Sequence, residues 1–302
     1  MVELSNVTRR YGRRRGIERV SLSIPAGTLY GFLGPNGAGK TTTIRVLLGL
    51  LRPQAGRASA FGLDCWSDSA VIKRDVGYLP GDLRLYGWMS CRNGLRAVER
   101  IRRRPMTAAG LALAQEWDLD PDVRASRMSR GMRQKLGLIL ALAHRPRLLV
   151  MDEPTAALDP LMQESLYTHL RRRVAEGATV FFSSHTLGEV ERLCDRVAIV
   201  RRGRIVADET LAALRARAQR VVTIHWHDGA ASGSIDPPSG LTVYRRQKDR
   251  WDATPSMPIA ELVRWAASQP IADLTISPPD LTTVFQSYYR DDNPAEPGDG
   301  SA

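Results

Sequence analysis

The stretch GPNGAGKT, from Gly34 to Thr41, decides the fold class of this chain. It fits the pattern G-x-x-x-x-G-K-[ST] at every specified position. The apolar run Leu29–Leu33 precedes it, and TTTIRVLLGLL, residues 41–51, follows it with apolar residues at helical spacing. A buried strand, a glycine-rich turn and a helix N-terminus form the geometry that holds phosphates. The sequence therefore predicts an α/β P-loop nucleotide-binding fold.

The residues of this loop have distinct expected roles. Glycines let backbone N–H groups approach the β- and γ-phosphates closely. Lys40 places a positive charge there, and the Thr41 hydroxyl is a predicted ligand of Mg²⁺. The predicted ATP-binding residues of the loop are Gly34, Pro35, Asn36, Gly37, Ala38, Gly39, Lys40, Thr41 and Thr42.

A second motif, LLVMDEPT at Leu148–Thr155, is an apolar run that ends in two acids. Such a run indicates a buried parallel strand whose carboxyl end meets the nucleotide. Asp152 is placed to hold Mg²⁺, directly or through water. Glu153 is placed to polarise the water that attacks the γ-phosphate. The motif therefore predicts an ATP-hydrolysing site with ATP and Mg²⁺ as cofactors.

Between these motifs lies MSRGMRQKLGLILALAH, Met128–His144, where Ser129 and Gly131 stand at the start of an apolar helix. A serine and a glycine at a helix start form an anion site. The stretch resembles the signature motif of ATP-binding cassette (ABC) transporter ATPases. The resemblance implies that it closes on the γ-phosphate of ATP bound to the opposite subunit of a dimer. The motif residues are Ser129, Arg130, Gly131 and Met132. The second and fourth differ from the commonest form, which has glycine and glutamine there.

Other landmarks of that family follow in order. Ala157-Leu158-Asp159 resembles the loop that crosses the dimer interface, and this assigns Asp159 to that interface. The run FFSSH resembles a strand that ends in the family's switch histidine. The resemblance implies that His185 senses the γ-phosphate and holds Glu153 and the attacking water. Tyr11 matches the aromatic residue that stacks on adenine.

One landmark departs from the family pattern. The stretch VGYLPGDLRLY, Val76–Tyr86, aligns with a loop that normally carries a glutamine after Tyr-Leu-Pro, but here Gly81 and Asp82 follow. In the family that glutamine contacts Mg²⁺ and water and links the site to the membrane partner. Glycine has no side chain for either contact. Asp82 is therefore a candidate metal ligand in its place, and a water molecule is the alternative.

Composition changes along the chain predict two domains. Residues 1–218 resemble an ABC ATPase, which implies a RecA-like core, an antiparallel β subdomain and an α-helical subdomain. Residues 219–290 are expected to form a small C-terminal α+β domain, and the polar residues 291–302 a disordered tail. The C-terminal end of the small domain, residues 277–289, resembles the end of ABC-2-type exporter ATPases. The expected strands of the small domain are residues 221–226, 241–246 and 272–277, and its expected helix is residues 258–269.

The composition favours a soluble globular protein. Of the 302 residues, 43% are hydrophobic and 25% are charged. The longest apolar stretch, residues 136–143, is shorter than the roughly 20 residues of a membrane-spanning helix. The net charge of +11 is consistent with anionic partners, but a GC-rich genome, which favours arginine codons, is the preferred explanation. Few aromatic residues stand among the basic runs, so nucleic-acid binding is not expected. The three cysteines are expected to be buried thiols in a reducing cytoplasm.

These features predict the ATP-hydrolysing subunit of an ABC exporter for drugs, antibiotics or similar amphiphiles. The resemblance implies a homodimer, or a heterodimer with a similar ATPase, at the cytoplasmic face of the cell membrane. A separate transmembrane permease is expected to dock on the region from Gly77 to Ser126. The alternative is a soluble ABC ATPase that acts mechanically on ribosomes or DNA. Such proteins usually carry two cassettes or a long insertion, and this chain contains one cassette.

Overall fold

The computed structural model describes residues 1–12, 14–218, 220–227 and 235–277, and four single positions between 281 and 288. The chain forms two compact units, of which the first is Met1–Leu211 and the second begins at Ala212. The tail at 291–302 lies outside the described residues, as does most of the segment that resembles exporter ATPases. Within the described residues, no helix is both long and apolar enough to cross a bilayer.

The first unit alternates strands and helices along the chain. Its strands are β1 (Val2–Tyr11), β2 (Arg14–Ile24), β3 (Leu29–Leu33), β4 (Ala55–Ala60), β5 (Leu63–Asp64), β6 (Val76–Leu79), β7 (Leu148–Asp152), β8 (Thr179–Ser184), β9 (Arg196–Arg201) and β10 (Arg204–Thr210). Its helices are α1 (Lys40–Leu47), α2 (Ser69–Ile72), α3 (Cys91–Arg102), α4 (Thr107–Glu116), α5 (Arg130–Leu142), α6 (Pro160–Ala175) and α7 (Leu187–Leu193), and α8 (Leu211–Arg217) starts where this unit ends. Short 3₁₀ turns, η1 (Lys73–Asp75) and η2 (Ala125–Arg127), complete the list.

A six-stranded sheet forms the centre of this unit, in the order β10-β9-β3-β8-β7-β6. All neighbouring pairs are parallel except β10 with β9. Every residue of β3, β7 and β8 is buried, as expected for strands covered on both faces. In register, Leu33 lies beside Ser184, and Asp152 lies beside Ser183. The three strands therefore end at one edge, which brings together the loops that follow them.

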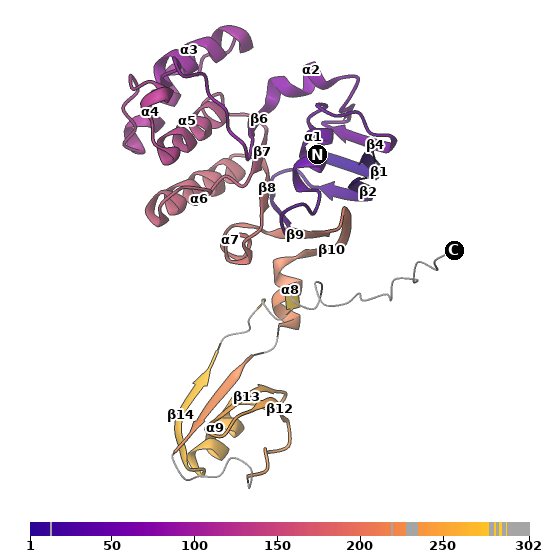
Figure 1. Cartoon of the computed structure of the whole chain (residues 1–302), viewed down its shortest axis with the longest axis vertical. Helices are drawn as coiled ribbons and strands as arrows, with labels where there is room; N and C mark the ends of the chain where they lie inside the picture. Colours follow the sequence, from indigo (N-terminus) through magenta and orange to yellow (C-terminus); the bar gives the residue numbers. More distant parts are fainter. Residues whose placement is uncertain are drawn as a thin grey trace, which may run out of the picture. The chain divides into compact units, whose positions relative to one another are not determined.

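A second, antiparallel sheet, in the order β2-β1-β4-β5, lies beside α1 and the central sheet (Figure 1). Its inward side chains, such as Val7 and Val20, join the same buried cluster as Phe32 and Ile44. This packing fixes α1 between the two sheets, so the loop before α1 is held by both.

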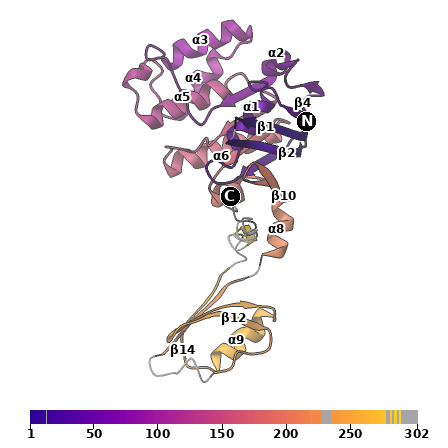
Figure 2. The same ribbon diagram turned by 45° about the vertical axis from the view of Figure 1, so that its right-hand side comes forward.

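Helices α3, α4 and α5 gather on the opposite side of the unit from the antiparallel sheet (Figures 1 and 2). Ser129 caps α5, because its Oγ accepts the Met132 N–H at 3.2 Å. The unit thus has a parallel core, an antiparallel sheet and a helical layer. The predicted α/β P-loop NTPase fold class is confirmed.

The second unit contains a four-stranded antiparallel sheet in the order β12-β13-β11-β14. Trp226, Trp251 and Trp265 pack edge to face in its small core. The sequence analysis expected three of these strands and the helix, but not β13. Their bounds are β11 (Val222–Trp226), β12 (Leu241–Arg246), β13 (Arg250–Pro255), β14 (Ile271–Ile276) and α9 (Ile259–Ala267).

Candidate functional site

The loop between β3 and α1 wraps around the start of the helix. Gly37 and Gly39 have φ angles of +79° and +109°, a backbone conformation that favours glycine. A Cβ on Gly39 would approach Ile17 Cγ2 to 2.7 Å, so a side chain there would displace the β2 strand. The first N–H groups of a helix have no intrahelical acceptors, and here they face the loop. The loop is therefore shaped so that its backbone N–H groups can contact a bound anion directly.

Lys40 lies inside this loop and is only 5% exposed. Its Nζ donates to the carbonyl oxygen of Gly34 at 2.7 Å and to that of Pro35 at 3.3 Å. A cavity of about 260 Å³ opens beside it. The lining residues are Gly16, Asn36, Gly37, Gly39, Lys40, Thr41, Thr42 and Glu153. Of the other predicted loop residues, Gly34 and Ala38 are buried and Pro35 is exposed.

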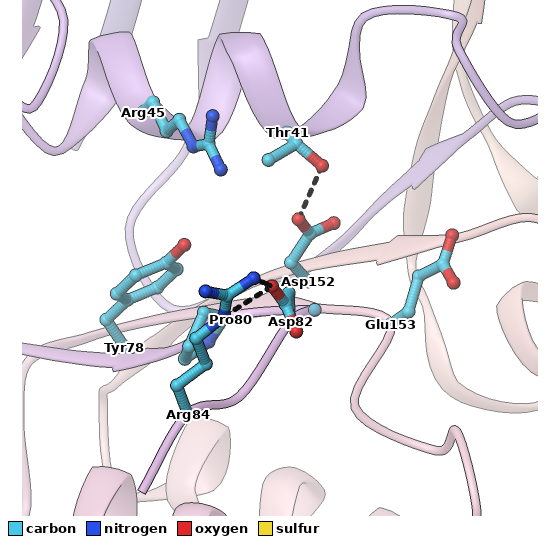
Figure 3. Close-up of a pocket in the computed structure, with 9 residues that line it drawn as sticks. Thr41, Arg45, Tyr78, Pro80, Asp82, Arg84, Asp152 and Glu153 are labelled. Carbon is cyan, nitrogen blue, oxygen red and sulfur yellow. Dashed lines mark hydrogen bonds and ion pairs between the residues drawn. The ribbon is translucent and has the colours of Figure 1, made fainter.

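Thr41 and Asp152 meet at the sheet edge although they are far apart in sequence. Thr41 Oγ1 donates to Asp152 Oδ2 at 2.7 Å (Figure 3), and Ser183 Oγ donates to Asp152 Oδ1 at 2.5 Å. Asp152 is only 2% exposed, so these hydroxyls fix its carboxylate. A hydroxyl and a carboxylate side by side are hard oxygen donors that suit Mg²⁺. The residues present therefore fit the predicted metal.

Glu153 lies between the side chains of Lys40 and His185. Its Oε1 is 3.3 Å from Lys40 Nζ and 3.3 Å from His185 Nδ1. Its backbone N–H donates to the Ser183 carbonyl oxygen at 3.1 Å. The structure therefore brings the predicted base, the phosphate-loop lysine and the predicted switch histidine to one point.

Gly81 lies directly against Asp152. A Cβ on Gly81 would be 3.4 Å from Asp152 Oδ2, which is ordinary contact. Asp82 instead forms an ion pair with Arg84 at 2.9 Å, and both side chains are largely exposed (Figure 3). Burial, with a smaller effect of the nearby Asp152 carboxylate, raises the pKa of Tyr78 above its ordinary value.

These residues line a cavity of about 610 Å³, into which Arg45 of α1 also points (Figure 3). Thr41 and Asp152 are at one side of the cavity and Tyr78 and Arg45 at the other (Figure 3). The lining residues are Thr41, Arg45, Tyr78, Pro80, Gly81, Asp82, Arg84, Asp152 and Glu153.

The signature residues lie at the N-terminus of α5. Ser129 and Arg130 are exposed, and Gly131 and Met132 are half-buried. A Cβ on Gly131 would be 3.0 Å from the carbonyl oxygen of Ala157, so this glycine packs closely on the loop that contains Asp159. The helix start is therefore open to a partner on one side and held by its own chain on the other.

Two further predicted residues are exposed. Asp159 caps α6, because its Oδ1 accepts the Met162 N–H at 2.9 Å. Tyr11 ends β1 with 40% of its surface exposed, and the Arg9 guanidinium lies 5.7 Å from its ring centroid. Both side chains are accessible to a ligand or partner.

The sequence analysis missed several residues that hold the site together. Ser183 stands inside the quoted run FFSSH, but only the pairing of β8 with β7 brings it to Asp152. Gln134 follows the signature, and its Nε2 donates to the carbonyl oxygen of Pro154 at 2.8 Å. Gln134 is a polar residue shortly after Ser129, in a helix that was expected to be apolar, and this could have indicated that it belongs to the site.

Comparisons with known proteins identify relatives of this chain. A model of the ABC transporter family matches residues 17–156. The Nod factor export ATP-binding protein I of Burkholderia orbicola is 35% identical over 212 residues, which cover 68% of this chain and 70% of that protein. The daunorubicin/doxorubicin resistance ATP-binding protein DrrA of Streptomyces peucetius is 32% identical over 267 residues, which cover 81% of this chain and 77% of that protein.

A solved structure, described as the ATP binding subunit of an ABC transporter, superposes with a TM-score of 0.68. It is 28% identical in sequence, and the match covers 72% of this chain and 92% of that one. The chain therefore belongs to the ABC transporter family as an ATP-binding subunit. It is an ABC ATPase.

Proposed function

We propose that this subunit hydrolyses ATP at the edge of the central sheet, with magnesium held by Thr41 and Asp152. The observation that supports this most directly is the meeting of Thr41, Asp152 and Glu153 at the carboxyl ends of β3 and β7. Asp82 remains a candidate ligand, but its carboxylate would have to leave Arg84 to reach the metal.

Bound Mg²⁺ would neutralise charge on the β- and γ-phosphate oxygens. Lys40 is placed to exchange its carbonyl partners for phosphate oxygens of the nucleotide. Glu153 accepts a proton from the attacking water, and His185 at 3.3 Å orients the Glu153 carboxylate and senses the γ-phosphate. Tyr11 is exposed at the end of β1 and is our candidate for stacking on adenine.

We propose that two such subunits enclose two ATP molecules head to tail. Ser129 and Arg130 are exposed at the start of a 13-residue helix, which provides anion-binding N–H groups to a second copy or to a similar ATPase. The close packing of Gly131 on the loop of Asp159 supports one shared interface for both motifs. Closure of the dimer would then complete each site.

The transporter partner is proposed to be a separate membrane permease. The region from Gly77 to Ser126 contains a stacked and exposed aromatic pair, Tyr86 and Trp88, with ring centroids 5.9 Å apart. Exposed aromatic residues are typical anchors of protein interfaces. A groove of about 890 Å³ is lined by α2, η1 and the C-terminal part of α3. Its lining residues are Ala70, Lys73, Arg74, Val98, Ile101, Arg102 and Arg103.

Export is the direction supported by the relatives, whose names refer to Nod factor export and to daunorubicin and doxorubicin resistance. We propose export of a drug, an antibiotic or a similar amphiphile. The proposed location is the cytoplasmic face of the cell membrane, where the permease would hold the subunit. The domains expected from the sequence, residues 1–218 and 219–290, are proposed as a catalytic domain and an accessory domain, although the compact units divide at Leu211 and Ala212.

Glu153→Gln tests the assignment of the base. The variant should bind ATP but hydrolyse it very slowly, because the amide cannot accept the proton from water. Size-exclusion chromatography with ATP and Mg²⁺ should show an accumulated dimer. Hydrolysis near the wild-type rate would contradict the assignment.

Recovery of the tagged subunit from native membranes in mild detergent tests the partner. Mass spectrometry should identify a polytopic membrane protein at a stoichiometric level. Recovery only from the soluble fraction, with ribosomal proteins or DNA, would favour a mechanical factor with the same ATP site.

A further inference from the structure

Glu189, in the first turn of α7, joins the two loops that carry the proposed catalytic residues. Thr155 Oγ1 donates to Glu189 Oε1 at 2.6 Å, and Ser184 Oγ donates to Glu189 Oε2 at 2.5 Å. Thr155 stands two residues after Glu153, and Ser184 stands one residue before His185. Each carboxylate oxygen of Glu189 therefore holds one of the two loops.

Both hydroxyls form their shortest hydrogen bonds with this carboxylate. Thr155 is 6% exposed and Ser184 is 2% exposed, so water cannot readily replace a lost acceptor. Ser184 Oγ also accepts the Thr186 N–H at 2.8 Å, and its two possible acceptors are Glu189 Oε2 at 2.5 Å and the more distant Thr186 carbonyl oxygen at 3.2 Å. A hydrogen bond to a carboxylate is stronger than one to a neutral acceptor. In the described part of the chain, Glu189 forms no ion pair with a lysine, arginine or histidine.

Glu189 and its two hydrogen bonds form a clamp between the loops, and the backbone conformation at Glu153 explains why such a clamp is needed. Glu153 has a φ of +51°, a conformation that is costly for a residue other than glycine. Such a conformation persists only where the surroundings fix it. The residues around it are held by β8 through Ser183, by α5 through Gln134, and by α7 through Glu189. The contact from α7 extends further, because Glu189 also accepts from Ser184, the residue directly before His185.

We propose that Glu189 is a positioning residue for ATP hydrolysis. It fixes the loop of Glu153 relative to the loop of His185, and so maintains the 3.3 Å distance between Glu153 Oε1 and His185 Nδ1. Glu189 has no direct contact with the nucleotide in this scheme. The inference rests on the proposed roles of Glu153 and His185.

Glu189→Ala removes both hydrogen bonds and is expected to lower kcat on the order of 10- to 100-fold, as loss of a supporting hydrogen bond does in other sites. The KM for ATP and the affinity for a fluorescent ATP analogue should stay within about twofold of wild type, because the phosphate loop is not part of the clamp. Glu189→Gln keeps one acceptor oxygen and should restore part of the activity. Glu164→Gln is the matched control, since Glu164 on α6 accepts from Arg192 of α7 but contacts neither loop.

A double-mutant cycle with His185→Ala separates positioning from a general structural role. If Glu189 acts through His185 and Glu153, adding Glu189→Ala to His185→Ala should cause little further loss of kcat. Losses that multiply, or a Glu189→Ala variant with parallel losses of ATP-analogue binding and thermal stability, would overturn the proposal. Near-normal hydrolysis by His185→Ala and Glu153→Gln would instead reject the proposed function on which it rests.

Discussion

Gly81→Gln is expected to lower the Mg²⁺ concentration that the ATPase requires. The φ of Gly81 lies outside the left-handed region, and a Cβ there would meet Asp152 Oδ2 at 3.4 Å. A glutamine is therefore tolerated, and its amide extends into the cavity lined by Thr41 and Asp152. The amide oxygen adds one donor near the proposed metal position.

The size of the effect follows from two opposing terms. A polar contact to a charged group contributes about 1.5–3 kcal/mol. Ordering a glutamine side chain costs about 1.5 kcal/mol, which leaves a net gain of up to about 1.5 kcal/mol. About 1.4 kcal/mol corresponds to a factor of ten, so the middle of this range, about 0.75 kcal/mol, lowers the half-saturating Mg²⁺ concentration roughly threefold, and its upper end lowers it roughly tenfold.

The assay is ATP hydrolysis as a function of Mg²⁺ at a fixed, saturating ATP concentration. Gly87→Gln is the matched control, because Gly87 lies in the same loop and its Cβ would contact Ser126 rather than the site. Both substitutions restrict the unfolded chain equally, so their effects on stability should be similar. An unchanged Mg²⁺ requirement in a folded Gly81→Gln variant would refute the reasoning.

Three further outcomes test other parts of the molecule. Ser129→Ala should lower kcat roughly tenfold or more, with little change in ATP binding by the single subunit. Loss of the helix cap should also cost about 1 kcal/mol of stability. A loss of ATP binding as large as the loss of kcat would contradict a role in trans. Asp82→Ala should change the half-saturating Mg²⁺ concentration less than about twofold, because its carboxylate is exposed and paired with Arg84; a larger rise would identify a ligand. Burial, more than the nearby Arg102, lowers the pKa of His144 from 6.5 to about 4. Below about pH 6.5 the unfolded chain therefore binds a proton at His144, whereas the folded protein binds it only near pH 4, and stability falls as the pH falls. Urea unfolding should therefore show stability falling by up to about 3 kcal/mol from pH 6.5 to pH 4, and His144→Leu should remove most of this fall.

The site could be predicted from sequence where its residues are contiguous. The loop at 34–42, Asp152 with Glu153, and the serine that caps α5 all lie in short motifs at the boundary of an apolar run. Such a run specifies a buried strand or helix by itself, and the motif at its end specifies the chemistry. The expected strand Leu29–Leu33 is β3 without any change of bounds.

Strand β13 shows where local patterns fail. Its residues, Arg250–Pro255, include a charged pair, Arg250 and Asp252, and end in a proline, which are weak strand signals. In the sheet, Asp252 Oδ1 accepts from Thr223 at 3.1 Å and from Arg250 at 2.8 Å, so this oxygen is satisfied although the residue is buried. Only the pairing with β11 and β12 makes this stretch a strand.

By itself the sequence determined the elements and the chemical groups at their ends, because hydrophobic periodicity and loop motifs act over a few residues. The tertiary structure alone decided that Thr41 meets Asp152 and that Glu153 has a left-handed backbone. It also decided that Glu189 joins two loops. These contacts depend on strand order and register, which place residues far apart in the chain within hydrogen-bond distance.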